Sequence, residues 1–256
     1  MKMKRYLVFP IMFSYFFING LYATSARAED LTPMLDKISK RMNSYPGNNN
    51  WKYGIVTKSI ETNEQWQPKK TTISKAIIKV VDSMVSGELL EAVEIENGNS
   101  KDISQKIATQ LKEQMESANK ETAKRKGQKG IENALDIFFP FNDNKRAKFE
   151  FRLLNGADIN ERPVLIIEAL AKEKDARLFE GKYYIDEETY DVLKAQITPS
   201  KNPKFVKDMY MDIDFEVLPE GNFIRRRSKT RVNGSFLFKR TWIIFEEEYF
   251  DVKILN

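Results

Sequence analysis

Apolar residues recur at every second position through much of the last third of the chain, residues 179–252, and turn signals separate the runs. The clearest run is 209–217, in which apolar and polar residues alternate without a break. Its apolar members are Met209, Met211, Ile213, Phe215 and Val217, and its polar members are Tyr210, Asp212, Asp214 and Glu216. A period of two is typical of a strand with one dry and one wet face, so we expect four or five strands in this region.

Runs of β-branched and aromatic residues predict further strands along the chain. The expected strands cover residues 51–55, 71–81, 88–96, 148–154, 163–171, 182–185, 192–197, 205–217, 223–232 and 235–252. Between the last two, Asn233-Gly234 is a strong signal for a two-residue hairpin turn.

Two segments show the helical period instead. Residues 31–44 carry an apolar stripe opposite charges of both signs, and residues 101–120 carry a second stripe. The mixed charges favour packing on the fold over a membrane-surface helix for the first segment. Because the order of elements lacks a βαβ rhythm, the pattern predicts an α+β fold, a large antiparallel sheet with helices on one face.

The segment after the second helix changes character abruptly. Residues 120–129 are rich in Lys, which is typical of a solvated loop or frayed helix end, with an anionic headgroup or nucleic acid contact as the alternative. Residues 131–141 are the most hydrophobic piece after the N-terminal segment. Their period fits neither helix nor strand, so they are expected to be core or to lie across a cavity mouth. The candidate side chains there are Leu135, Ile137, Phe138 and Phe139.

The N-terminus has the layout of a secretory signal. A basic head precedes the apolar run 6–22, and Ala26-Arg27-Ala28 supplies a cleavage site before Glu29. The alternative, an uncleaved anchor, is disfavoured because the run is short and contains Pro10 and Gly20. We therefore expect residues 1–28 to be a signal peptide, residues 29–256 to form one domain, and the protein to be exported.

Export changes the meaning of the charge. The 256-residue chain has a net charge of +5, but residues 1–28 hold four of its 42 basic residues and none of its 37 acidic ones. The remainder has 38 basic and 37 acidic residues, a net charge of +1. The basicity therefore gives no support to nucleic acid binding.

The chain contains no Cys and no His. This excludes a Ser-His-Asp triad, a thiol nucleophile and His-containing zinc or haem sites. The acidic groups at 186–188 and 246–248 are the remaining candidates for carboxylate chemistry. Asp186 and its neighbours fit a turn, and Glu246–Glu248 alternate between two strand faces, so we expect no catalytic residue, metal or cofactor.

A basic set lies on the strand that follows residue 222. Arg225, Arg227, Lys229 and Arg231 share one face of a regular strand. They could form a ladder with Asp212, Asp214 and Glu216, or a rim for an anionic lipid headgroup or an acidic partner protein. A turn at Asn233-Gly234 would put aromatic residues on the same face, which leaves a bulge, a partner contact or arginine–ring stacking as explanations.

The run G-K-Y-Y-I-D-E-E-T at 181–189, followed by the strand 192–197 and the hairpins of 209–245, resembles the periplasmic outer-membrane lipoprotein-carrier (LolA-like) proteins. The likeness covers about residues 30–252 and is best after Phe149. A helical insert with a basic tail around 101–130 departs from the compact carriers. The family's functional positions do not map onto this chain, so none is transferred.

The resemblance implies a curved antiparallel sheet, an open half-barrel, whose concave face carries helices over a hydrophobic cavity. It also implies binding of lipid acyl chains or lipidated proteins by a monomer, without catalysis, as in outer membrane lipoprotein sorting and transport. The dry face of residues 209–217 and the four candidates around 135–139 are the expected lining or lid, although such a face can equally be packed core. The alternative function is a regulatory or scaffold module that binds a protein partner; an enzyme ranks third.

Overall fold

The structure is a computed structural model that describes residues 30–46, 50–125, 136–236 and 239–255. Residues from Leu31 onward form one compact unit. The expected signal peptide, part of the basic run (126–129) and Leu135 lie outside the described residues.

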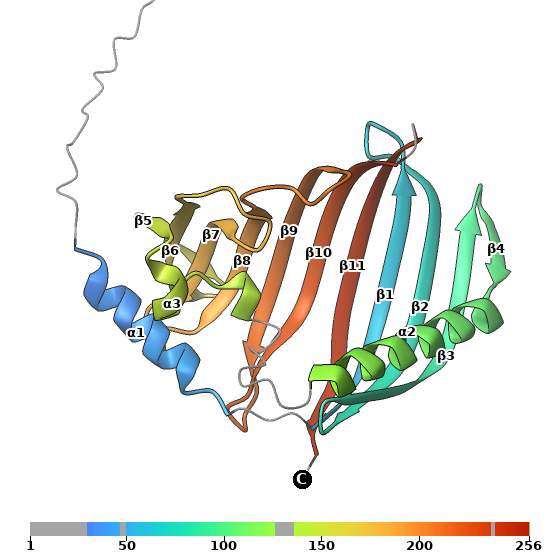
Figure 1. The fold of residues 1–256 in the computed structure, drawn as a ribbon, viewed down its shortest axis with the longest axis horizontal. Coiled ribbons are helices and arrows are strands. Elements are labelled where there is room, and N and C mark those ends of the chain that lie inside the picture. Colours follow the sequence, from blue (N-terminus) through green and yellow to red (C-terminus); the bar gives the residue numbers. More distant parts are fainter. Residues whose placement is uncertain (1–29, 47–49, 126–135, 237–238, 256) are drawn as a thin grey trace, which may run out of the picture. The chain divides into compact units, whose positions relative to one another are not determined.

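Eleven antiparallel strands form a single sheet in the order β4-β3-β2-β1-β11-β10-β9-β8-β7-β6-β5 (Figure 1). The strands are β1 (Trp51–Thr62), β2 (Pro68–Val81), β3 (Met84–Glu96), β4 (Asn99–Asp102), β5 (Phe149–Ile159), β6 (Arg162–Ala171), β7 (Phe179–Asp186), β8 (Val192–Pro199), β9 (Val206–Val217), β10 (Phe223–Phe236) and β11 (Lys239–Ile254). Each half of the chain pairs its strands in sequence order, and the pairing of β1 with β11 joins the halves. The sheet does not close, because β4 and β5 remain edges, which confirms the predicted α+β class with a large open sheet.

The predicted helices are present as α1 (Thr32–Asn43) and α2 (Ser104–Arg125), with two short pieces, η1 (Asp136–Phe138) and α3 (Asp143–Arg146), between α2 and β5. Pro33 stands in the first turn of α1, where its missing N–H costs nothing. The apolar stripe of α1 buries Leu35 and Ile38. The helical insert expected around 101–130 is therefore a helix over Ser104–Arg125.

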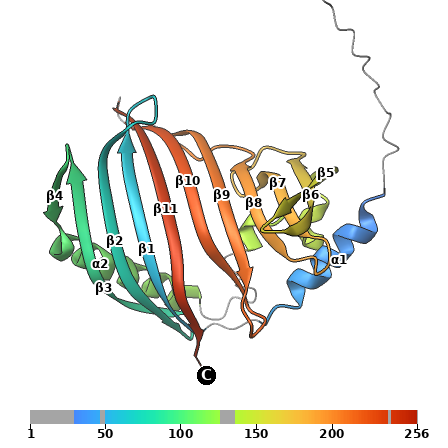
Figure 2. The ribbon, with the colours of Figure 1, turned by 180° about the vertical axis from the view of Figure 1, so that it is seen from behind.

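Strand register shows that α1 and α2 lie on the same face of the sheet. Residues paired directly across strands point to the same side. Ile213, which packs with α1, is linked through paired residues on β10, β11, β1 and β2 to Ala92 and Gly87 on β3. Those two residues contact α2 through Ser104 and Met115. Figures 1 and 2 agree, since α2 crosses in front of β3 in one view and behind it in the other. We call this side the helix-bearing face, and the opposite side, on which no described helix packs, the helix-free face.

The main core lies under α1 and residues 138–141. Phe139, Phe141 and Tyr183 are 1%, 0% and 0% exposed, and their rings contact one another or their neighbours. Tyr183 donates its hydroxyl hydrogen bond to the carbonyl of Phe138, which ties this segment to β7. Within the described part of the hydrophobic run 131–141, residues 139–141 are therefore core, whereas Ile137 is exposed.

The predicted turn at Asn233-Gly234 is wrong. Both residues lie within β10, paired with Trp242 and Thr241 of β11, and the hairpin closes after Phe236. The register of the pairing with β9 shifts between the same two residues, so Asn233 and Gly234 mark a bulge or irregularity within the strand and not a turn. The aromatic neighbours that this turn would have given the basic set are also absent from the pairing, because Arg227, Lys229 and Arg231 pair with Glu248, Glu246 and Ile244 of β11.

Gly181 in β7 has a φ of +144°, and an added Cβ would lie 2.2 Å from the carbonyl oxygen of Gln196. We expect Gly181→Ala to lower the free energy of unfolding by about 3 kcal/mol, through the backbone clash and the unfavourable φ together. Gly98→Ala, at φ +79° in open space, should cost about 1 kcal/mol because only the φ penalty applies. Urea unfolding of both variants measures the difference, and equal losses would contradict the clash.

Candidate functional site

The predicted dry face of β9 lies on the helix-bearing face and is packed. Met211, Ile213 and Phe215 are 6%, 0% and 6% exposed and belong to the main core. The ring of Phe215 stands 5.1 Å from that of Phe139, centroid to centroid. These three members of the predicted lining are therefore packed core in this structure.

Other members of the predicted lining set are more accessible. Met209 and Val217 are half-buried at the margin of the core. Phe138 is also half-buried, with its ring against that of Phe179 at 5.3 Å, and Ile137 is 45% exposed. Their part in ligand binding stays a prediction.

Helix α1 is held over this core by a buried carboxylate immediately before β8. Asp191, 7% exposed, accepts hydrogen bonds from the Arg41 Nε at 2.5 Å, the Tyr45 hydroxyl at 2.6 Å and the Thr189 hydroxyl at 2.8 Å. Burial alone would raise the pKa of Asp191, but the three donors outweigh it and the pKa is lowered. The charge of Asp191 therefore stabilises the position of α1.

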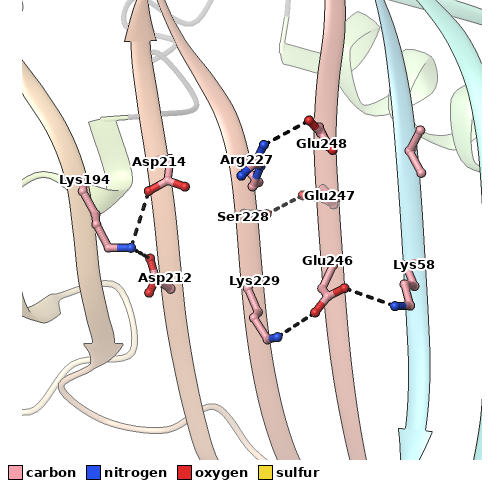
Figure 3. A pocket seen from close by; sticks show the side chains of 11 residues that line it. Lys58, Lys194, Asp212, Asp214, Arg227, Ser228, Lys229, Glu246, Glu247 and Glu248 are labelled. Carbon is pink, nitrogen blue, oxygen red and sulfur yellow. Dashed lines mark hydrogen bonds and ion pairs between the residues drawn. The ribbon is translucent and has the colours of Figure 1, made fainter. Parts of the chain in front are cut away.

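The helix-free face carries charges that alternate in sign from strand to strand across β8, β9, β10, β11 and β1 (Figure 3). The cations are Lys194, Arg227, Lys229 and Lys58, and the anions are Asp212, Asp214, Glu246 and Glu248. They surround a depression of ≈ 470 Å³. Ion pairs of 2.5 to 3.6 Å link each of these charges to a neighbouring strand.

This arrangement is the predicted charge ladder with different partners. Arg227 and Lys229 stand opposite Asp214 and Asp212 on β9, yet their ion pairs go to Glu248 and Glu246 on β11. Glu216 pairs with Arg226 at 3.5 Å. Because the face neutralises itself, it offers little net charge to an anionic headgroup or an acidic protein.

Arg225 does not share this face. The register between β9 and β10 shifts between Arg225 and Arg227, so Arg226 is the extra residue and Arg225 turns to the helix-bearing face. There it pairs with Phe215 of β9 across the strands. The prediction that Arg225, Arg227, Lys229 and Arg231 share one face is therefore wrong for Arg225, and the bulge is the reason.

On the helix-bearing face, the middle strands present side chains that stand outside the main core. We call them the central strip: Arg225, Ser228, Thr230 and Val232 of β10; Ile243, Phe245, Glu247 and Tyr249 of β11; Tyr53, Ile55, Thr57 and Ser59 of β1. Phe245 is 39% exposed, and Ile55, Ile243 and Val232 are half-buried. The strip therefore shows apolar side chains to solvent between the part packed by α1 and the part packed by α2.

One end of the central strip is polar. The Arg225 guanidinium lies 2.9 Å from Glu247 Oε2, donates a hydrogen bond to the Tyr249 hydroxyl and stacks over the Tyr249 ring at 5.0 Å. The ring of Tyr53 lies 5.4 Å from that of Tyr249. Burial opposes the charge of Arg225, yet its neighbours Tyr249 and Glu247 raise its pKa. Burial raises the pKa of Tyr53 to about 12, so this phenol is neutral at physiological pH.

The two acidic groups behave as the sequence predicts. Asp186 Oδ1 accepts hydrogen bonds from the backbone N–H groups of Glu188 and Thr189, which is turn chemistry. Glu246 and Glu248 point to the helix-free face and Glu247 to the helix-bearing face. Within the described ranges, no group of three or more acidic residues could hold a metal ion, and no helix has the length and apolar character needed to cross a membrane.

Sequence reasoning missed the central strip and Asp191. Residues of β1 and β11 that pair in the strip lie about 190 positions apart in the chain, and no short-range sequence pattern predicts their pairing. The alternation of Ile243, Phe245, Glu247 and Tyr249 was the available signal, since it marks one face of β11.

We expect Asp191→Asn to weaken the attachment of α1, by about 1–2 kcal/mol at pH 7, because a buried acceptor loses its charge while its donors remain. Since the pKa of Asp191 is lowered on folding, its contribution is present above the ordinary pKa of 3.8 and disappears as pH falls below it. Unfolding by urea at pH 7 and pH 3 should therefore show a difference from the native protein that shrinks at pH 3. Asp143→Asn, a change at an 80%-exposed side chain, is the control; a pH-independent loss in Asp191→Asn would refute the role of the charge.

Comparison with known proteins finds solved structures that resemble this chain, but no match to a family model or a curated sequence. Among solved structures, an outer membrane lipoprotein-sorting protein domain from Vibrio parahaemolyticus matches with a TM-score of 0.39 and 12% identity, over 87% of this chain and 92% of that one. A LolA superfamily protein from Nitrosomonas europaea gives 0.32 and 9%, over 88% and 93%. The MucA/MucB complex of Pseudomonas aeruginosa gives 0.27 and 7%, over 89% and 99%.

The resemblance expected from the sequence is thus found among solved structures, which include lipoprotein-sorting and LolA superfamily proteins. With TM-scores below 0.5, these likenesses assign no ligand and no partner to this chain.

Proposed function

We propose that this protein is an exported, non-catalytic binding protein that holds the hydrocarbon chain of a lipid or a lipidated protein on the central strip. The observation that carries the proposal is the exposure of Phe245, at 39%, beside half-buried Ile243 and Val232. These side chains lie on the helix-bearing face, which elsewhere is packed under α1 or against α2. An apolar patch on a stable sheet, flanked by packed parts, is a surface that gains free energy when a ligand covers it.

Hydrocarbon burial supplies the free energy for such binding. Each methylene group removed from water contributes about 0.8 kcal/mol, so a long chain binds tightly without specific polar contacts. The helix-free face is unsuited to this task because its charges would lose water under a hydrocarbon chain. The chemistry of the two faces therefore supports the helix-bearing side as the side that binds an apolar ligand.

The predicted lining residues fit this proposal in part. Met209 pairs with Val232 and so borders the central strip, and it is half-buried. It can contact a ligand there without displacement of the core. Ile213 and Phe215 instead form the packed wall beside the strip. Leu135 lies outside the described residues, and its expected role as lining stays part of the proposal.

Location follows from the sequence rather than from the fold. We include in the proposal that residues 1–28 direct export and that the protein acts in the periplasm as a lipid or lipoprotein carrier. The alternative, a regulatory module that binds a protein surface through the same sheet, requires no hydrocarbon binding. The two functions therefore separate in a direct binding measurement.

The test uses a fluorescent alkyl probe and two substitutions of equally exposed rings. Phe245 on the central strip and Tyr210 on the helix-free face are both 39% exposed. We expect the native protein, purified without detergent, to bind the probe, and Phe245→Ser to weaken binding about tenfold or more through lost apolar contact area. Tyr210→Ser should leave the affinity unchanged.

Absence of probe binding to the native protein, together with absence of lipid in native mass spectrometry, would overturn the proposal in favour of a protein-binding module. An equal effect of both substitutions would show that the probe does not bind at the central strip.

A further inference from the structure

The central strip contains a single pair of opposite charges, Arg225 and Glu247. Their side chains are 24% and 28% exposed and 2.9 Å apart, among apolar, hydroxyl and aromatic neighbours. Desolvation of each partly buried ion is unfavourable, and an apolar pair of similar size would often stabilise the sheet as well. Packing alone therefore gives no reason for charges at this position.

The pair also sits at one end of the strip. Tyr53 and Tyr249 accompany it there, whereas Phe245, Ile243 and Val232 follow along β10 and β11 in the direction away from it. From Tyr249 to Ile243 the strand extends about 20 Å at roughly 3.3 Å per residue. Beyond the charged pair, the strip carries the apolar side chains of Phe245, Ile243 and Val232 together with the hydroxyl groups of Thr230 and Ser59. Charge is therefore confined to one end of the strip, as it is in an amphiphilic lipid.

The charge balance of this end restricts the ligand. An anionic group that took Arg225 would leave Glu247 as a partly buried carboxylate without its partner, and a cation on Glu247 would do the same to Arg225. A ligand with one anionic and one cationic group exchanges the internal pair for two external pairs. No uncompensated charge is then left in the complex.

We propose that Arg225 and Glu247 recognise the headgroup of a zwitterionic phospholipid, and this rests on the proposed binding of hydrocarbon to the central strip. The phosphate oxygens accept hydrogen bonds from the Arg225 guanidinium, and the ammonium group donates to the Glu247 carboxylate. The Tyr249 ring, already stacked under Arg225, holds the guanidinium in place. The acyl chain lies along Phe245 and Ile243.

A matched control exists on the other face of the same two strands. Arg227 and Glu248 form an ion pair of 3.2 Å on the helix-free face, between β10 and β11. Arg227→Gln removes a positive charge two positions from Arg225, and Glu248→Gln removes a negative charge one position from Glu247. Neither substitution changes a residue of the central strip. They report any general effect of net charge on lipid capture.

The experiment measures lipid extracted from vesicles that contain phosphatidylethanolamine, phosphatidylglycerol and diacylglycerol in equal amounts, by native mass spectrometry of the full chain. We expect about tenfold more phosphatidylethanolamine than phosphatidylglycerol on the native protein, since one charge-assisted hydrogen bond has that effect. Glu247→Gln should reverse the preference, because Arg225 is then free to take an anion. Arg225→Gln should remove the preference of the protein for phosphatidylethanolamine over diacylglycerol.

The double variant Arg225→Leu/Glu247→Leu guards against misfolding of the single variants, because it removes both charges together. It should retain diacylglycerol and lose headgroup selectivity, while the two control variants behave as the native protein. Equal capture of the two phospholipids by the native protein, with diacylglycerol still bound, would overturn this inference and leave the hydrocarbon site intact. Failure to capture any of the three lipids would instead overturn the proposed function itself.

Discussion

An open sheet of eleven strands has two broad faces, and the rest of this structure depends on how each is kept from unfavourable contact with water. The described helices pack on one face only, through α1 with residues 136–141 at one side and α2 at the other. Buried rings such as Phe139 and Tyr183 close the first region. The strands between them carry apolar side chains that remain partly exposed, and this incomplete cover is the physical basis of the proposed ligand site.

The helix-free face carries charged side chains, which interact favourably with water. Each strand from β8 to β1 presents one sign, and its neighbours present the other. Exposed ion pairs contribute little individually, about 0–1 kcal/mol, but a ladder of them keeps the face hydrated and sets strand register. The chain therefore leaves apolar side chains partly exposed on one side of its sheet and places paired charges on the other. At the Arg226 bulge, the arginines of β10 are divided between the two faces.

The sequence predicted what depends on local periodicity and missed what depends on register. Both long helices and the strand over 209–217 follow from their repeat of apolar residues. The bulge between Arg225 and Arg227 has no such mark, so the arginines were assigned to one face. The dry face of β9 looks identical in sequence whether it is core or ligand lining, and only burial distinguishes the two. The central strip joins β1 to β11, from opposite ends of the chain, which local patterns cannot reveal.

The most direct measurement is a crystal structure of the protein isolated from its native membrane compartment without detergent. The account predicts elongated density along β11 and β1 on the helix-bearing face, with its polar end between Arg225 and Glu247 and with α1 still fastened to Asp191. Density inserted between α1 and β9 would contradict this prediction, as would a central strip covered by the chain's own side chains.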